Sequence, residues 1–136
     1  MKRVFLDTNV AIDLMARREP FFVDAKAIFD RSADGDFVIL LSVLSFWNIF
    51  YLMRKDPGEA KAKTDLATLE TLVQVVPAQV ADLRNALSSS IKDLEDAMQL
   101  ESAKAAAADV FVTRDVKGFK GSRIPVMTPS AFLRAL

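Results

Sequence analysis

The side chains best suited to chemistry in this sequence are the carboxylates of three aspartates, Asp7, Asp96 and Asp115. The chain contains no histidine and no cysteine, so neither imidazole nor thiolate can act as a nucleophile, a general base or a metal ligand. Any metal site must therefore be built from oxygen donors, which favours Mg²⁺ or Mn²⁺ over Zn²⁺. These residue types point to chemistry at a carboxylate-bound metal.

The positions of the three aspartates predict that they converge. Asp7 directly follows the first predicted strand, and Asp115 follows the fourth. Asp96 lies on a predicted helix, on the same face as Asp93 three residues earlier. If the two strands are neighbours in a parallel sheet, their carboxyl ends bring the acids to the edge where such sheets bind ligands. Carboxylates gathered there repel one another, and a cation is the simplest compensation.

Each aspartate also has a simpler interpretation, which the sequence leaves open. Asp7 could cap the helix that follows it, Asp96 could be a solvated residue near a helix N-terminus, and Asp115 could occupy an ordinary turn. The joint placement of the three favours a metal site over three unrelated roles.

A polar stripe interrupts a predicted helix that is otherwise apolar. Ser42, Ser45 and Asn48 are spaced three residues apart along it. A buried amide without partners costs about 1–3 kcal/mol, so we expect Asn48 to face polar groups or a metal-bound water. The alternative is an amide hydrogen-bonded within the core or at an interface.

Alternating strands and helices are predicted to position these residues. The predicted strands are residues 2–6, 37–41, 73–76, 109–113 and 124–126, the last a short edge strand. The predicted helices are residues 10–15, 20–29, 42–55, 59–72, 78–89, 93–108 and 129–136. The expected fold is a single domain over residues 1–136, with three Rossmann-like α/β/α layers around a central parallel sheet of four to five strands.

The composition narrows the possible functions. Hydrophobic residues make up 51% and charged residues 26%, a balance that argues against disorder. No apolar run approaches the roughly 18–20 residues that cross a bilayer, and charge interrupts the first residues too soon for a signal peptide. We therefore expect a cytoplasmic protein without membrane contact. Because the net charge is +0, a nucleic-acid partner would need local basic patches.

Three segments carry a pattern that is more specific than the single residues: Val4–Asn9, Asp93–Gln99 and Ala108–Phe119. Together they resemble the PIN domain (PilT N-terminus) family, and most closely the stand-alone bacterial proteins similar to VapC-type toxins. The resemblance covers essentially the whole chain. It implies a PIN-like fold and a ribonuclease that uses Mg²⁺ or Mn²⁺ to hydrolyse RNA phosphodiester bonds, as the toxin of a toxin–antitoxin pair.

The resemblance also assigns roles to residues. The first, third and fourth acids of the family site match Asp7, Asp96 and Asp115, which are therefore expected to bind metal and to be catalytic. The second acid is usually a glutamate, and Asn48 takes its place among the expected catalytic residues. An amide oxygen carries no charge, so Asp93 is expected as a further metal ligand, and Glu95 is near enough in sequence to compensate as well.

RNA and protein partners are expected around this site. The residues expected to contact RNA lie beside the acids in the sequence: Thr8, Asn9, Arg114 and Lys117. A metal there would lower the pKa of a bound water and stabilise charge on the phosphate. The resemblance implies a homodimer, and an antitoxin protein that covers the acids.

The apolar helix supports the expectation of a partner. A helix that covers a sheet needs only one apolar stripe, whereas residues 43–53 are apolar on nearly every side. The candidates for a surplus face are Trp47, Phe50, Tyr51 and Met53. Large exposed apolar patches usually mark interaction sites. Packing against residues 60–72 of the same chain is the alternative.

Other functions remain as alternatives. A PIN-fold protein with weakened catalysis, which binds RNA or a protein without efficient turnover, is favoured by Asn48. A receiver domain needs an acidic pair after the first strand and an acceptor aspartate after the third, which here ends at Pro77. A haloacid-dehalogenase-like phosphatase needs Asp-x-Asp, whereas Asp7 begins Asp-x-Asn. Both of these fit poorly.

Overall fold

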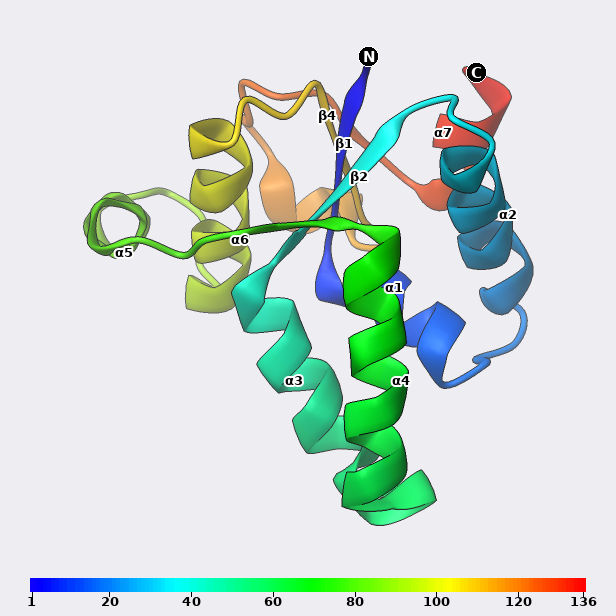
Figure 1. The fold of residues 1–136 in the computed structure, drawn as a ribbon. Coiled ribbons are helices and arrows are strands. Elements are labelled where there is room, and N and C mark those ends of the chain that lie inside the picture. Colours follow the sequence, from blue (N-terminus) through cyan, green and yellow to red (C-terminus); the bar gives the residue numbers. More distant parts are fainter.

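Strands and helices alternate along the chain in the computed structural model, which describes all residues from 1 to 136 (Figure 1). The strands are β1 (Arg3–Leu6), β2 (Val38–Ser42), β3 (Gln74–Val76), β4 (Val110–Val112) and β5 (Val126–Met127). The helices are α1 (Thr8–Met15), α2 (Phe22–Ala33), α3 (Val43–Met53), α4 (Glu59–Leu72), α5 (Val80–Leu87), α6 (Leu94–Ala105) and α7 (Pro129–Arg134). A helical turn, η1 (Arg54–Gly58), joins α3 to α4, and a 3₁₀ turn, η2 (Val116–Phe119), follows β4.

All five strands are parallel, in the order β3-β2-β1-β4-β5. Phe5 of β1 pairs with Leu40 of β2 on one side and with Phe111 of β4 on the other. The chain therefore builds outward from β1 to β3, and then crosses back to place β4 beside β1. This confirms that the first and fourth strands are neighbours, and it puts the topological switch point between them.

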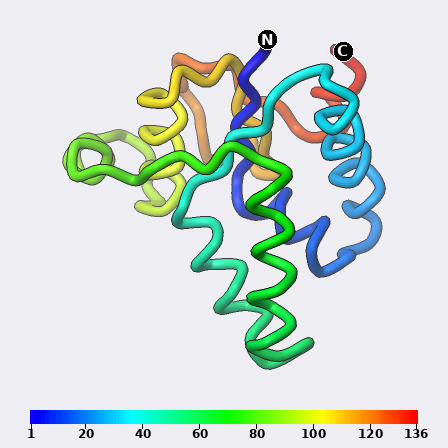
Figure 2. The backbone as a smooth tube through the Cα atoms, viewed as in Figure 1, coloured from blue at the N-terminus to red at the C-terminus, as the bar shows by residue number.

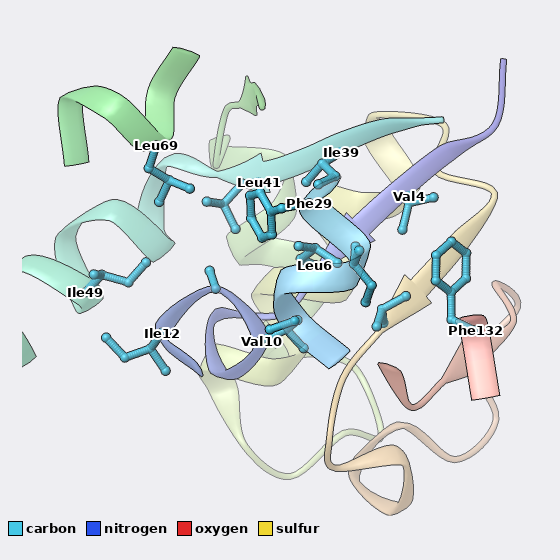
Figure 3. Close-up of a cluster of buried hydrophobic side chains, with 14 of the residues drawn as sticks. Val4, Leu6, Val10, Ile12, Phe29, Ile39, Leu41, Ile49, Leu69 and Phe132 are labelled. Carbon is cyan, nitrogen blue, oxygen red and sulfur yellow. The ribbon is translucent and has the colours of Figure 1, made fainter. Parts of the chain in front are cut away.

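Side-chain alternation along the strands supplies two buried clusters, one on each face of the sheet. Val4 and Leu6 point into the larger cluster, which α1, α2, α3, α4 and α7 cover (Figure 3). Phe5 and Phe111 point the other way, toward α6 and η2, and their rings stack at 5.2 Å between centroids. Phe119 of η2 packs against Phe111 at 4.6 Å. The predicted three-layer α/β/α arrangement is therefore confirmed.

Two local features differ from the prediction. The fifth strand begins at Val126 rather than at Ile124, because Pro125 has no N–H to donate to a ladder. The Pro125 carbonyl still accepts the N–H of Phe111 at 2.9 Å. The η2 turn was not predicted, and its four residues carry no periodic signal of their own.

The α3–α4 pair extends away from the sheet (Figures 1 and 2). On α3, Met53 is buried and Phe50 packs against the larger cluster, whereas Trp47 is 62% exposed and Tyr51 is 52% exposed. Packing against α4 therefore accounts for only part of the apolar surface of α3. None of the helices has the length and apolar character that crossing a membrane requires.

Candidate metal centre

Asp7 and Thr113 lie in contact at the topological switch point, at the carboxyl ends of β1 and β4. The Asp7 N–H donates to the Val112 carbonyl at 2.9 Å, which holds the ends of β1 and β4 side by side. The Thr113 hydroxyl donates to Asp7 Oδ2 at 2.8 Å, and Asp7 Oδ1 accepts the Thr8 N–H at 2.8 Å. Asp7 therefore caps α1 and also belongs to the sheet edge, with 4% of its surface exposed.

The first turn of α6 brings further acids to the same edge. Asp93 is the N-cap, and its carboxylate accepts the Asp96 N–H at 2.9 Å. Glu95 and Asp96 follow in the first turn, where the helix dipole favours negative charge. Asp93 and Asp96 line one cavity together with Asp115, so the structure joins α6 to the end of β4.

Gly118 makes room for two of these carboxylates. A β-carbon at this position would lie 2.9 Å from Asp115 Oδ2 and 3.3 Å from Asp96 Oδ2. The oxygens of Asp96 and Asp115 therefore both face the space that a side chain at position 118 would fill. The glycine is required here by close approach rather than by its backbone angles.

Burial, with a contribution from neighbouring charges, raises the pKa values of three acids: Asp7, Glu95 and Asp96. Burial raises the pKa of Asp7; hydrogen bonds from Thr113 and Thr8 oppose this rise, and nearby carboxylates add to it. Burial also raises the pKa of Asp96, to about 7, and neighbouring carboxylates contribute: Asp7, Asp93, Asp115 and Glu95. The charges of Asp93 and Asp115 thus act on both Asp7 and Asp96 as like charges, which is the electrostatic condition that favours a bound cation.

Asn48 lies beside one of these acids, Glu95. Burial raises the pKa of Glu95, as do the charges of Asp7 and Asp93, while a hydrogen bond with the Asn48 side chain lowers it. Asn48 is half-buried on the side of α3 that faces the N-terminus of α6. Glu95 therefore places a carboxylate next to the amide of Asn48.

The donor set fits a hard divalent cation, although the side chains are not arranged as a coordination shell. In this conformation no three acidic side chains surround one point closely enough to hold an ion. Asp7 turns its oxygens to Thr113 and Thr8 instead. Binding would therefore require side-chain rotation at the site. All the available donors are oxygens, which is the ligand type that Mg²⁺ and Mn²⁺ prefer.

A buried hydrogen-bonded cluster lies behind the acids and joins three helices. The hydroxyls of Thr8 on α1 and Ser45 on α3 lie 2.7 Å apart, and Gln99 Nε2 on α6 donates to them at 3.1 Å and 3.2 Å. Gln99 Oε1 is the one buried side-chain polar atom without a partner. The cluster ties α1, which Asp7 caps, to α6, which carries Asp96.

The four residues expected to contact RNA have different surroundings. Thr8 is buried in the cluster described above, and Asn9 donates to the Thr113 hydroxyl at 3.1 Å. Arg114 forms a two-pronged ion pair with buried Asp13, at 2.7 Å and 3.2 Å, and its guanidinium lies over the Phe21 ring. Lys117 is exposed and lines the cavity of Asp96 and Asp115. Of the four, only Lys117 offers a free cation to a ligand.

The sequence reasoning missed several residues that shape the site. Thr113 holds Asp7, accepts from Asn9, and accepts the Asp115 N–H at 3.1 Å. A polar residue at the end of a buried strand, two positions before an expected ligand, was an available signal for Thr113. Gly118 and Gln99 gave no signal, because close approach and helix-to-helix contact appear only in three dimensions.

The sequence matches the PIN domain family over residues 3–117. A search of curated proteins finds no match. This family match confirms the resemblance inferred from the three sequence segments.

Solved structures share the fold over nearly the whole chain. A chain of VapBC-1 from nontypeable Haemophilus influenzae superposes with a TM-score of 0.72 at 16% identity, covering 94% of this chain and 98% of that one. A chain of a toxin–antitoxin complex from Klebsiella pneumoniae superposes with a TM-score of 0.66 at 23% identity, covering 93% of this chain and 97% of that one. VapC20 of Mycobacterium tuberculosis is described as a toxin that cleaves the sarcin–ricin loop. It superposes with a TM-score of 0.62 at 17% identity, covering 79% of this chain and 86% of that one. At these identities the likeness shows the fold.

The raised pKa of Asp96 predicts that this residue destabilises the metal-free protein at neutral pH. Between pH 3.8 and about pH 7, the folded protein keeps a proton on Asp96 that the unfolded chain has released. The free energy of unfolding therefore falls as the pH rises through this range. We expect Asp96→Asn to raise the free energy of unfolding by about 1 kcal/mol at pH 8, after allowance for solvent screening. The gain should vanish near pH 4.

Urea unfolding in chelator at the two pH values measures this difference. Asp34→Asn, in an exposed turn, is the matched control and should show no gain that depends on pH. A wild-type protein more stable than Asp96→Asn at pH 8 would contradict the account of repulsion.

Proposed function

This chain belongs to the PIN domain family, and on that premise we propose that it is a ribonuclease that hydrolyses RNA phosphodiester bonds with Mg²⁺ or Mn²⁺. Members of the family are generally nucleases. The observation that carries the proposal is the gathering of five carboxylates at the switch point of the sheet, on a chain without histidine or cysteine. Phosphodiester cleavage by this set of side chains requires a metal.

The residues have distinct roles in this mechanism. Asp7, Asp96 and Asp115 would hold the ion, with Asp93 as a further ligand. When bound, the ion would lower the pKa of an attacking water and stabilise charge on the phosphate. Thr113 holds Asp7 in place, and Gly118 leaves the space into which Asp96 and Asp115 point.

Asn48 and Glu95 bear on how active the enzyme is. Asn48 carries no charge, which supports the second candidate function: a PIN-fold protein that binds RNA or a partner with little turnover. Glu95 lies within hydrogen-bonding reach of Asn48 and is coupled to the charge of Asp7. A carboxylate therefore remains available on that side of the site, which favours the active enzyme.

The expected RNA contacts are revised by their surroundings. Lys117 stays in the proposal as a contact to the RNA backbone, since its amine has no ion pair and lies beside Asp115. We assign Arg114 a positioning role, because its ion pair with Asp13 of α1 anchors the residue that precedes Asp115. Asn9 supports the site from within through Thr113.

We also propose that the protein is the toxin of a toxin–antitoxin pair and that two copies associate. Several structures that share the fold are toxin–antitoxin complexes, including the one from Klebsiella pneumoniae. The exposed apolar side chains of α3 support a protein partner: Val43, Trp47, Tyr51 and Leu52. Such a patch is typical of interaction surfaces.

Cleavage of RNA tests the proposed activity. The purified protein should cleave mixed RNAs in the presence of Mn²⁺, and the cleavage should stop when a chelator is added. Asp7→Asn, Asp96→Asn and Asp115→Asn should each lower the rate by at least about 100-fold, since even outer partners of metal ligands are worth roughly 10–100-fold. Asp34→Asn is the control that should retain full activity. Cleavage that persists in chelator, or in Asp7→Asn, would refute the mechanism.

Light scattering tests the association of two copies. At micromolar concentration the wild-type protein should have twice the 15.0 kDa mass of one chain. Trp47→Lys should shift the mass toward that of one chain, because it puts a charge on the apolar face of α3. Val80→Lys, at a similarly exposed apolar position on α5, is the control and should leave the dimer intact. A monomer mass for the wild type would disprove the dimer.

A further inference from the structure

A separate cavity of about 410 Å³ lies between the N-terminal ends of α2 and α7, two helices on the face of the sheet opposite to α6 (Figure 1). Phe21 and Asp24 at the start of α2, Arg114 after β4, and residues 128–130 at the start of α7 line it. Its volume falls within the roughly 300–1,000 Å³ of small-molecule sites. Because Arg114 directly precedes Asp115, this cavity begins one residue away from the acids.

Two planar groups lie together in the wall of this cavity. The Phe21 ring is 42% exposed, and the Arg114 guanidinium lies over it at 4.1 Å from the ring centroid. Two hydrogen bonds to buried Asp13 fix the guanidinium and match its charge, so Arg114 contributes a flat surface rather than a free cation. Aromatic rings and guanidinium planes are the groups on which the unstacked bases of single-stranded RNA pack.

Asp24 places a carboxylate without a cationic partner in the same cavity. It is half-buried, and none of the ion pairs of the structure engages it. An ionised carboxylate is an acceptor with two oxygens, so it fits a ligand edge that presents two N–H donors side by side.

Guanine is the RNA base with that edge. Its N1–H and its N2 amino group are adjacent donors, whereas adenine and cytosine place an acceptor nitrogen beside their amino group and uracil has a single N–H. Ser130 adds a hydroxyl to the cavity; it accepts an Arg134 N–H at 3.2 Å, and its own hydrogen remains available for the guanine carbonyl O6. Stacking groups and polar groups therefore converge on one kind of base.

We propose that this cavity binds the guanine base of the RNA nucleotide beside the scissile phosphate. This inference rests on the proposed ribonuclease function and adds a site for base specificity to it. The base stacks on Phe21 and Arg114, and Asp24 accepts its two N–H groups. Consecutive α-carbons are about 3.8 Å apart, so a nucleotide whose phosphate lies at Asp115 can extend its base toward Arg114.

A comparison of two nucleotides isolates the contact with Asp24. Guanosine and inosine 5′-monophosphates differ by the N2 amino group alone. Each is titrated into the metal-free protein in chelator and followed by NMR of the backbone amides. The wild-type protein should bind the guanosine nucleotide at least about fivefold more tightly, because the inosine nucleotide leaves one carboxylate oxygen without a donor. The amide shifts should centre on Phe21, Asp24, Arg114 and Ser130.

Two variants and a control assign the contacts. Asp24→Asn should bring the ratio of the two affinities close to one, because a carboxamide has one acceptor oxygen instead of two. Asp34→Asn, which removes a carboxylate at the other end of α2, is the matched control and should keep the wild-type ratio. Phe21→Ala should weaken both nucleotides by at least about fivefold, which is the lower range for loss of a stacked base.

The outcomes separate the cavity from the catalytic proposal. No saturable binding of the guanosine nucleotide, equal affinities of the two nucleotides for the wild type, or an unchanged ratio in Asp24→Asn would overturn the guanine site, even if the protein cleaves RNA in Mn²⁺. The expected ratios without any cleavage of RNA support the guanine site and reject the ribonuclease. If RNA is cleaved, sequencing of the products should find guanine at one fixed position beside the cut; cuts without this preference contradict the role of the cavity.

Discussion

Repulsion among carboxylates at the switch point of the sheet is the constraint on which the rest of the structure depends. Parallel pairing of β1 with β4 brings Asp7 and Asp115 to one edge, and the first turn of α6 adds three more acids there. Burial at this edge raises the pKa values of Asp7 and Asp96, and the charges of neighbouring carboxylates add to the rise. The two apolar clusters on the faces of the sheet must therefore supply the stability that holds these charges together.

Neutral hydrogen bonds, rather than ion pairs, position the acids. Thr113 and the backbone of Thr8 hold Asp7, and the buried cluster of Ser45 and Gln99 ties α3 and α6 to α1. Arg114, which precedes Asp115 in the sequence, is paired with Asp13 rather than with these acids. This separation keeps the carboxylates of the site available for an ion.

The fold and the acids were predictable because each rests on a local pattern. The alternation of strands and helices predicted the three layers. The positions of Asp7 and Asp115 after the first and fourth strands predicted that both residues lie at one edge of the sheet. The remainder depends on contacts between distant segments. The role of Gly118 follows from the close approach of the Asp96 and Asp115 carboxylates to its backbone. The ion pair of Arg114 depends on Asp13, which lies 101 residues away in the sequence.

Binding of Mn²⁺ to the metal-free protein, followed by calorimetry at pH 7.5 and at pH 5.0, tests the central claim most directly. If repulsion among the carboxylates drives binding, protons compete with the ion for Asp96, whose pKa is about 7. The account predicts saturable binding at pH 7.5 that is weaker by on the order of tenfold or more at pH 5.0, because a protonated carboxyl must first lose its proton to bind metal. Equal affinity at the two pH values, or no binding at pH 7.5, would contradict it.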